Sequence, residues 1–305
     1  MGAGHPECPE RLSAIEDRLL ITGVADALER REPAPASVAE LELAHGRMHI
    51  AALRGLSDEL KEEIAAGGPA HAQLDPDTSL NVHTWEAALL SAGAALNATD
   101  AVIAGELENA FCATRPPGHH ACRDKAMGFC FFNNVAVAAK YALERHHLRR
   151  VAIIDFDVHH GNGTQDVFYE DPNVFFFSTH QHPWYPGTGH ANETGRGKGA
   201  GTTLNCPLPA GSGRTEILGA FETQLVPAMK TFRPELVLIS AGFDSREGDP
   251  LGKFRLTDRD FADLTTTVRE IAADSANGRV VSVLEGGYSL EGLAKGVLAH
   301  VQALE

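Results

Sequence analysis

Six short runs of apolar and β-branched residues recur along the chain and predict buried β-strands. The clearest is the run Val-Ala-Ile-Ile at 151–154, which has no polar position on either face. A strand that is apolar on both faces is typical of a parallel sheet covered on both sides by helices. On this pattern we expect strands at residues 110–114, 151–156, 174–179, 202–206, 236–241 and 280–284.

Segments with apolar residues three or four positions apart separate these runs and predict helices. In the first of them, Leu12, Ile15 and Leu19 form one apolar stripe. Stretches rich in Pro, Gly or polar residues divide the elements, among them the connector at 32–39 and the loop at 69–82. The expected helices are residues 9–21, 48–66, 84–105, 131–147, 164–169, 215–232, 257–273 and 290–304.

The alternation of strands and helices from residue 110 onwards determines the expected fold class. Such alternation predicts an α/β fold, a single-domain three-layer α/β/α arrangement with a mainly parallel central sheet. The chain has no internal repeat, no low-complexity tract and no linker long enough to divide it. We therefore expect one domain over residues 1–305.

The strand at 151–156 ends in residue types that bind metals. Asp155, Asp157 and His159 follow one another at a spacing of two, and side chains at that spacing share one face of an extended segment. In open α/β sheets, sites are built at the carboxyl ends of strands. Two adjacent buried carboxylates are costly unless a cation neutralises them. Oxygen and nitrogen ligands together suit zinc or a similar divalent ion.

A single aspartate at this position would more often cap the following helix. Asp155, Asp157, His159 and His160 together favour a metal site instead. Asp244 closes the strand at 236–241 and is a candidate third ligand, although taken alone it could also be a helix cap. Two carboxylates and one imidazole would leave a position open for water, as catalytic zinc requires.

Two further strand ends carry candidate catalytic groups. His119 and His120 are adjacent in the rigid loop Arg-Pro-Pro-Gly-His-His, where one could act as a general base and the other could stabilise charge. Tyr288 follows two glycines in Glu-Gly-Gly-Tyr, and its hydroxyl could donate a hydrogen bond to a developing oxyanion. Surface histidines and a core tyrosine are the respective structural alternatives.

Two aromatic residues in loops are candidate walls of a substrate tunnel. Phe129 follows Gly128, and Tyr185 lies in the Pro- and Gly-rich segment 183–189. Flat rings can enclose an aliphatic substrate stem. Ordinary loop packing is the alternative for both.

The net charge bears on which partners the protein can bind, and the cysteine content bears on its cellular compartment. The net charge of −15 argues against non-specific binding to nucleic acid and would attract a cationic substrate. The five cysteines are scattered, without a Cys-x-x-Cys pair, which indicates a reducing compartment. No apolar run approaches the roughly 20 residues of a membrane span, and the first residues lack the features of a secretory signal. We expect a cytoplasmic protein with no nucleic-acid or membrane partner.

Six motifs in order resemble those of the zinc-dependent histone deacetylase superfamily. They are Arg-Pro-Pro-Gly-His-His, Gly-Phe-Cys-Phe-Phe-Asn-Asn, Asp-Phe-Asp-Val-His-His-Gly-Asn-Gly-Thr-Gln, Pro-Gly-Thr-Gly, Ala-Gly-Phe-Asp and Glu-Gly-Gly-Tyr. The resemblance covers nearly the whole chain and implies the arginase/deacetylase-like fold. It extends to bacterial deacetylase-like amidohydrolases and acetylpolyamine amidohydrolases. Asn162, where class I enzymes carry Asp, makes the chain similar to the class II branch.

The resemblance implies a role for each matching residue. The expected zinc ligands are Asp157, His159 and Asp244. The expected catalytic residues are His119 paired with Asp155, His120 paired with Asn162, and Tyr288 facing the substrate carbonyl. The expected substrate-binding residues are Gly128, Phe129, Tyr185, Leu251 and Asp77. The family also binds potassium, for which one stretch matches at Asp155, Asp157, His159, Ser178 and Thr179, and a weaker one at Phe168, Asp171 and Val174.

The chain departs from the family pattern at its start and at the rim of the site. Relatives begin with a strand and a loop before the stretch that matches residues 5–12, so we expect that first strand to be absent. Arg11 matches an arginine behind the metal. Tyr185 replaces a more common phenylalanine and would make the tunnel wall more polar. Leu251 stands where a polyamine-selective relative carries a glutamate, which weakens a polyamine assignment.

The resulting expectation is a zinc-dependent amidohydrolase that removes acetyl or other acyl groups from N-acylated amines, above all acetyl-lysine in proteins or peptides. An acetylpolyamine deacetylase is the first alternative. A non-catalytic acyl-lysine-binding module is an alternative of another class, and an arginase-like enzyme with paired manganese is a third. The expected partner is an acetylated lysine or small amine, and a homo-oligomer remains open.

Overall fold

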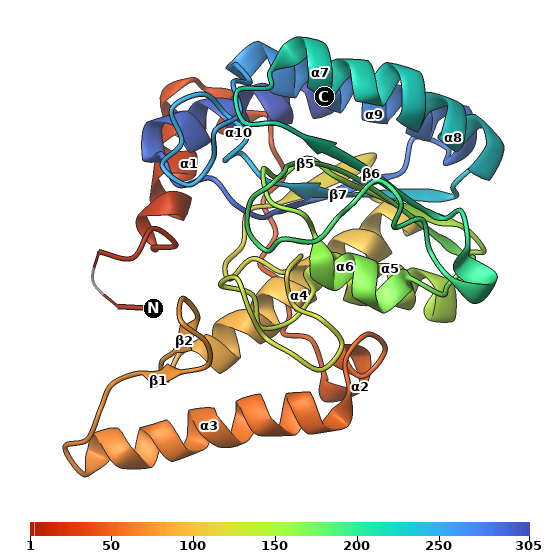
Figure 1. Cartoon of the computed structure of the whole chain (residues 1–305). Coiled ribbons are helices and arrows are strands. Elements are labelled where there is room, and N and C mark those ends of the chain that lie inside the picture. Colours follow the sequence, from red (N-terminus) through yellow and green to blue (C-terminus); the bar gives the residue numbers. More distant parts are fainter. Residues whose placement is uncertain (3) are drawn as a thin grey trace.

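Six parallel strands form the centre of the molecule (Figure 1). The computed structural model describes residues 1–2 and 4–305. The strand order is β3-β8-β7-β4-β5-β6, and every neighbouring pair is parallel. All six predicted strands are confirmed, as β3 (Asn109–Cys112), β4 (Val151–Asp155), β5 (Val174–Gln181), β6 (Thr203–Leu208), β7 (Leu236–Ala241) and β8 (Val280–Leu284).

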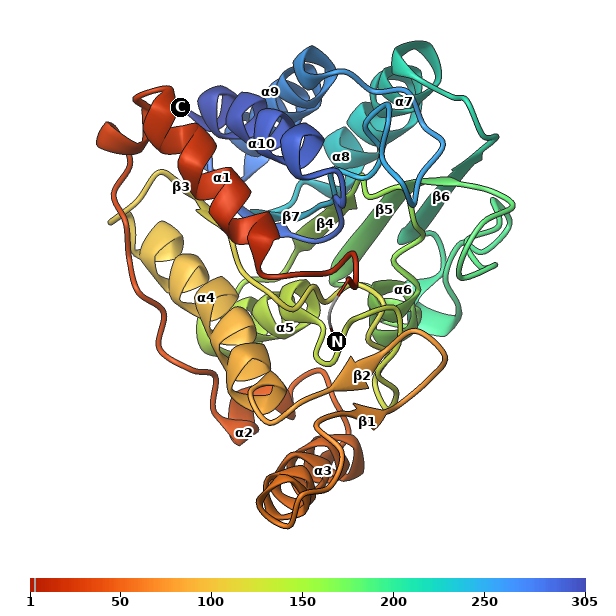
Figure 2. The same cartoon turned by 90° about the vertical axis from the view of Figure 1, so that its left-hand side faces the viewer.

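Helices cover both faces of this sheet, which confirms the three-layer arrangement (Figures 1 and 2). One face is covered by α1 (Glu10–Ile21), α7 (Arg214–Ala220), α8 (Val226–Phe232), α9 (Asp258–Ser275) and α10 (Leu290–Leu304). The other is covered by α4 (Thr84–Ala104), α5 (Asn134–Arg145) and α6 (Asn162–Phe168), with α2 (Val38–Leu41) and α3 (Arg47–Ala65) beyond them.

The apolar residues of β4 pack in two separate hydrophobic cores, one on each face of the sheet. Ala152 and Ile154 pack in the core under α9 and α10, whereas Val151 and Ile153 pack in the core under α4 and α5. All four residues are completely buried. Alternate residues of a strand point to opposite faces, so a strand between two helical layers needs apolar residues at every position.

Three local features differ from the sequence expectations. The helix expected at 215–232 is interrupted by a π-helical turn at Phe221–Leu225 between α7 and α8. The loop expected at 69–82 contains a small antiparallel hairpin of β1 (Ala72–Gln73) and β2 (Ser79–Leu80). The connector at 32–39 runs into α2, which Ser37 and Glu40 stabilise through a capping box. Within residues 1–2 and 4–9 the structure has no strand before α1.

Helix α4 corrects the statement that no apolar run approaches the length of a membrane span. It is 21 residues long and contains an 18-residue window with a mean hydropathy of 1.4, enough to cross a bilayer by length and composition. In the fold, 56% of this apolar stretch is buried, and α4 packs against α5 and β3. Its apolar character therefore fits a core helix.

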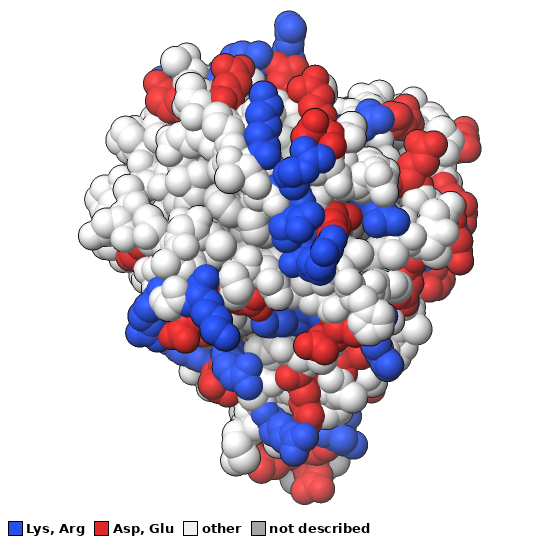
Figure 3. Space-filling model, turned by 90° about the vertical axis from the view of Figure 1, so that its right-hand side faces the viewer, with Lys and Arg blue, Asp and Glu red and all other residues white. Residues whose placement is uncertain are grey.

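Both signs of charge occur together on the surface. On the face opposite to that in Figure 2, Lys and Arg side chains are interspersed with Asp and Glu (Figure 3). Ion pairs such as Arg196–Glu170 and Arg233–Asp274 neutralise part of the basic charge. This face does not form one continuous basic surface of the kind that nucleic acid binds.

A buried histidine is expected to make folding stability fall in acid. His300 lies between β8 and α9, where Thr265 Oγ1 accepts from its Nδ1 at 2.6 Å and Ser282 Oγ donates to its Nε2 at 2.8 Å. Thr265 Oγ1 uses its own proton to bond Phe261 O, so the ring is neutral with its hydrogen on Nδ1. Burial lowers the pKa of His300 to about 3.

In the unfolded chain this imidazole has a pKa near 6.5. Between about pH 6.5 and 3 only the unfolded state binds the proton, so the free energy of unfolding decreases as the pH falls. In His300→Gln the slope of urea-unfolding free energy against pH should become shallower by up to about 1.4 kcal/mol per pH unit. An equal slope in both proteins would show that His300 is not the titrating group.

Candidate active site

The predicted site residues lie where three neighbouring strands end. Asp157 and His159 follow β4, Asp244 follows β7, and the Glu285–Tyr288 segment follows β8. Strand β7 pairs with both β4 and β8, so the carboxyl ends of the three strands meet at one edge of the sheet. The topology thereby brings together residues that are far apart in the sequence.

Asp157, His159 and Asp244 form one buried group. His159 Nδ1 lies 3.0 Å from Asp157 Oδ1 and 3.2 Å from Asp244 Oδ2. One candidate ligand atom from each residue lies within 4.8 Å of the others. Backbone amides orient the carboxylates, since Gly286 N donates to Asp157 Oδ2 and Val158 N donates to Asp244 Oδ1, both at 2.9 Å.

The electrostatics of this group fit a divalent cation. Burial and repulsion from Asp157 raise the pKa of Asp244 to about 7, so two charged carboxylates are costly here without a counter-charge. Asp244 Oδ2 is buried and has no well-aligned hydrogen-bond donor. A Cβ at Gly286 would lie 2.0 Å from that oxygen, so the glycine keeps the space beside it open. Two carboxylates and an imidazole are a suitable donor set for zinc.

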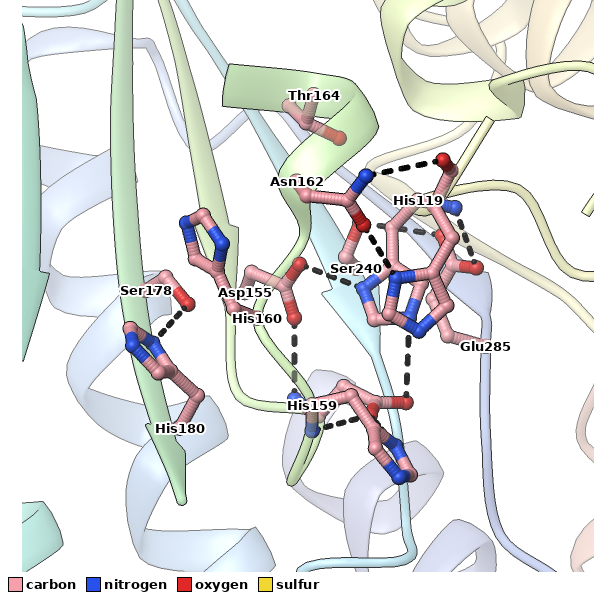
Figure 4. Close-up of polar contacts among 12 residues, drawn as sticks. His119, Asp155, His159, His160, Asn162, Thr164, Ser178, His180, Ser240 and Glu285 are labelled. Atoms are coloured by element: carbon pink, nitrogen blue, oxygen red, sulfur yellow. Dashed lines mark hydrogen bonds and ion pairs between the residues drawn. The ribbon is translucent and has the colours of Figure 1, made fainter. Parts of the chain in front are cut away.

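The two adjacent histidines have different partners; His119, Asp155 and Asn162 are labelled in Figure 4. His119 Nδ1 lies 2.9 Å from Asp155 Oδ2, and His120 Nδ1 lies 2.7 Å from Asn162 Oδ1. Their ring centroids are 4.1 Å apart. Both pairings predicted from the sequence are therefore present in the structure.

Their surroundings also shift the pKa values of the two histidines in opposite directions. Burial alone would lower the pKa of His119, but Asp155, Asp157 and Glu285 outweigh it and raise that pKa well above the usual value. Burial and repulsion from His119 lower the pKa of His120 well below the usual value. One protonated and one neutral imidazole side by side are suited to charge stabilisation and general-base catalysis, respectively.

Tyr185 packs against the site histidines, and Phe129 packs against Tyr288. Tyr185 is 37% exposed, and its ring lies perpendicular to that of His120 at 5.2 Å and to that of His159 at 6.2 Å. Phe129 packs edge-on against Tyr288 at 5.9 Å. Burial and the nearby Asp244 charge raise the pKa of the Tyr288 phenol, which therefore keeps its proton and can donate it in a hydrogen bond.

A turn with unusual backbone geometry places Phe129. Gly128 and Phe129 have φ values of 57° and 68°, in the left-handed region. A Cβ at Gly128 would lie 2.4 Å from His120 Cδ2, so only glycine fits beneath the histidine ring. Phe129 N donates to Thr78 Oγ1 at 3.0 Å, and Thr78 Oγ1 donates to Asp77 at 3.0 Å. This chain of contacts places Asp77 beside the Phe129 wall.

Leu251 is held by Trp184 and Asp249, to which the sequence analysis assigned no role. Trp184 Nε1 donates to Leu251 O at 2.9 Å, and Leu251 N donates to Asp249 Oδ1 at 2.9 Å. Asp249 Oδ2 also accepts from Tyr288 N at 2.8 Å. Asp249 therefore couples the position of Leu251 to that of Tyr288. Its partners are backbone amides, which leave no residue pattern to detect in a sequence.

The residues expected to bind potassium include Asp155 at the end of β4 and Ser178 and Thr179 on the neighbouring strand β5. Asp155 is in register with Ser178, whose hydroxyl hydrogen-bonds with His180 Nδ1 at 2.9 Å (Figure 4). The adjacent Thr179 is buried. In the weaker match, Asp171 N donates to Phe168 O at 3.0 Å near the start of β5 at Val174. Lys140 Nζ lies 2.6 Å from Asp171 Oδ2, so an ammonium group already neutralises that carboxylate.

Glu285 is a further buried residue that the sequence interpretation did not assign. Its Oε2 accepts from Gly118 N at 2.6 Å and His119 N at 3.1 Å, and its Oε1 accepts from Ser240 Oγ at 3.1 Å. Arg11, which matched an arginine behind the metal, donates to the backbone oxygens of Glu285 and Gly287. Glu285 thereby fixes the backbone that presents the two catalytic histidine candidates.

Two substitutions of Glu285 should distinguish the effect of its hydrogen bonds on turnover from the effect of its charge. Glu285→Gln keeps an oxygen for both amides, whereas Glu285→Ala leaves two buried N–H groups without partners. We expect the alanine variant to lose at least about tenfold in turnover, the equivalent of one unmet buried hydrogen bond, and the glutamine variant to lose less. Ser240→Ala, which leaves the amide contacts intact, is the control. Equal losses in the Gln and Ala variants would contradict an amide-positioning role.

A buried metal-binding group beside paired histidines at the carboxyl edge of a parallel sheet is typical of metal-dependent hydrolases. Comparison with known proteins gives the family. Residues 5–304 match the family model of the histone deacetylase domain, and the chain belongs to that family.

Individual relatives agree with this assignment. The histone deacetylase-like amidohydrolase of Pseudomonas aeruginosa is 41% identical, over 94% of this chain and 73% of its own length. The human polyamine deacetylase HDAC10 is 42% identical over 98% of this chain, which spans 45% of that longer protein. The crystal structure of the HDA15 HD domain superposes on this chain with a TM-score of 0.91 at 35% sequence identity. The match covers 100% of this chain and 86% of the HDA15 chain.

Proposed function

We propose that this chain is a zinc-dependent deacetylase that hydrolyses the amide of N-acetylated amines, with acetyl-lysine as the first substrate. The observation that supports this most is the position of His120, whose ring centroid lies 5.8 Å from that of His159 in the metal-binding group and whose pKa is lowered by burial. We further propose that residues 1–305 form one catalytic domain. The cytoplasmic location and the oligomeric state remain predictions for experiment.

The three residues of the metal-binding group would hold the zinc ion. A bound zinc ion supplies a Lewis acid that polarises the amide carbonyl and lowers the pKa of water. His120 would take a proton from the attacking water through its Nε2, because its Nδ1 is engaged with Asn162. Tyr288 would donate a hydrogen bond to the oxyanion as it develops. His120, or protonated His119, would then give a proton to the leaving amine.

The rings around the site would control access. Phe129 and Tyr185 would enclose the aliphatic stem of the acylated amine, and Gly128, which lies against the His120 ring, would line the stem beside them. Leu251 and Asp77 would lie at the rim of the tunnel, where an apolar and an acidic side chain could contact the parts of the substrate outside it.

Zinc analysis combined with an acetyl-lysine peptide assay tests this function. We expect about one zinc ion per chain, release of acetate, and loss of activity on chelation that added zinc restores. A protein with stoichiometric zinc that hydrolyses none of a panel of acyl-amines would instead be the non-catalytic binding module. Two metal ions per chain with urea release would indicate arginase-like chemistry. Among the described residues, a single group of three or more metal-ligating side chains lies together, which favours one ion.

An acetylpolyamine is the alternative substrate. The similarity to the human polyamine deacetylase supports it, whereas the apolar Leu251 at the rim offers no charge for a second ammonium group. The ratio of kcat/KM for acetylspermidine to that for an acetyl-lysine peptide measures the preference directly.

Potassium binding near Asp155 and Ser178 is a separate proposal. Oxygen ligands around a hard monovalent cation would stabilise the buried Asp155 from behind the histidines. Activity and melting temperature measured in potassium, sodium and tetramethylammonium chloride at equal ionic strength would test it. The pairing of Lys140 with Asp171 argues for one potassium ion rather than two.

A further inference from the structure

The amide of Asn162 has sulfur atoms on one side and a histidine on the other. Its Oδ1 lies 2.7 Å from His120 Nδ1. Its Nδ2 lies 3.4 Å from each of three acceptors, the backbone oxygen of His120, Cys122 Sγ and Met127 Sδ. This set of neighbours is independent of the metal ligands.

The chemistry of these neighbours determines which way the amide points. A thioether sulfur and a carbonyl oxygen accept hydrogen bonds and cannot donate them. The NH₂ group of Asn162 must therefore face Met127 and the backbone oxygen of His120, which leaves the amide oxygen facing His120 Nδ1. An acceptor at that place requires the hydrogen of the neutral imidazole to be on Nδ1, and the lone pair is then on Nε2. A reversed amide would place the hydrogen on Nε2 and remove the base.

We propose that Cys122 and Met127 are positioning residues whose sulfur atoms, together with the backbone oxygen of His120, set the direction of the Asn162 amide and thereby the tautomer of His120. The inference rests on the proposed function, in which His120 Nε2 accepts the proton of water. Met127 Sδ meets the Asn162 amide alone, whereas Cys122 Sγ also lies 3.7 Å from the backbone oxygen of His120.

The loop between His120 and Phe131 is built to present both sulfurs at this point. Cys122 N donates to Lys125 O, and Met127 exchanges two backbone hydrogen bonds with Cys130. His45 fixes the same loop through its Nδ1, which lies 3.1 Å from Cys122 O. Two tight turns thus bring residues 122 and 127 to the same side of Asn162.

The two sulfur-containing side chains could act by orienting the Asn162 amide or only by filling space. The variant Asn162→Asp distinguishes these two roles. A carboxylate presents an oxygen to His120 whichever way it turns, so it needs no acceptors to orient it. Loss of the sulfurs should therefore reduce activity in the Asn162 protein and have little effect in the Asn162→Asp protein. A double-mutant cycle measures this coupling.

The cycle uses Met127→Leu and Cys122→Ala together, in both backgrounds. With Asn162 present, we expect kcat to fall by about tenfold, the equivalent of one unmet buried hydrogen bond, with KM and zinc content unchanged. In the Asn162→Asp background the same pair should change kcat by less than about twofold. Cys122→Ser keeps an acceptor and should restore part of the loss. Met229→Leu, in the buried core on α8, is the control for the Met-to-Leu change.

A spectroscopic measurement keeps the test decisive if Asn162→Asp is inactive. The ¹⁵N shifts of His120, assigned by comparison with His120→Gln, report the tautomer directly. We expect the hydrogen on Nδ1 in the parent and a shift toward Nε2 in the double variant. Equal kcat losses in both backgrounds, or an unchanged tautomer, would overturn the inference. A parent protein that hydrolyses no acyl-amine while His120 keeps the Nδ1 hydrogen would overturn the proposed function instead.

Discussion

Asp244→Ala should lose zinc and turnover together. The substitution removes one of two carboxylates in the metal-binding group and the only one that has a buried oxygen without a hydrogen-bond donor. Loss of a direct ligand should cost more than the roughly 100-fold in affinity that marks the upper range for residues behind the ligands. Zinc content after dialysis and turnover with an acetyl-lysine peptide are the measurements.

Asp244→Asn adds a prediction about the metal-free protein. Burial and, to a smaller extent, repulsion from Asp157 raise the pKa of Asp244 to about 7. The neutral amide of asparagine keeps the size of the side chain and removes this repulsion. The metal-free Asn variant should therefore melt no lower than the metal-free parent, although it binds zinc poorly. Asp58→Ala, on the exposed surface of α3, controls for the loss of one negative charge. Stoichiometric zinc and normal turnover in Asp244→Ala would show that Asp244 is not a ligand.

The sheet was predictable because its strands are buried on both faces. The runs at 236–241 and 280–284 coincide with β7 and β8, since every position in them is apolar or small. Strand β5 continues past its predicted end at 179 through His180 and Gln181. Those polar residues look like a loop in the sequence, but their backbones pair with β6. The π-helical turn at 221–225 changes the hydrogen bonding of a helix without changing its apolar period, so it leaves no signal in the sequence.

Site residues that are close together in the sequence were easier to predict than those that only the fold brings together. The spacing of Asp157 and His159 places them together through one extended segment, whereas Asp244 joins them only through the pairing of β4 with β7. Motif resemblance supplied that connection. Glu285 and Asp249 act on backbone amides of distant loops, and a sequence does not show which amides a carboxylate will meet.

Tyr288→Phe should leave an enzyme that binds zinc and substrate but turns over slowly. Only a hydroxyl is removed, and the ring can still pack against Phe129 and beneath the guanidinium of Arg11, 5.0 Å from its centroid. The hydroxyl is proposed to donate to the oxyanion beside zinc. Loss of one such donor typically lowers turnover by about 100- to 1000-fold. KM should change much less, because the bond is made mainly in the transition state.

A structural tyrosine would give a different combination of results. Tyr141 provides the comparison, because its hydroxyl donates to Asp100 at 3.2 Å on α4, away from the site. Tyr141→Phe should lower the melting temperature slightly and leave turnover within about twofold, as expected for a partly exposed hydrogen bond. If Tyr288→Phe behaves in the same way, with turnover within about threefold of the parent, its hydroxyl does not stabilise the oxyanion. If turnover collapses while zinc content and melting temperature stay constant, the hydroxyl acts on the reacting carbonyl, since packing and metal binding are then unchanged.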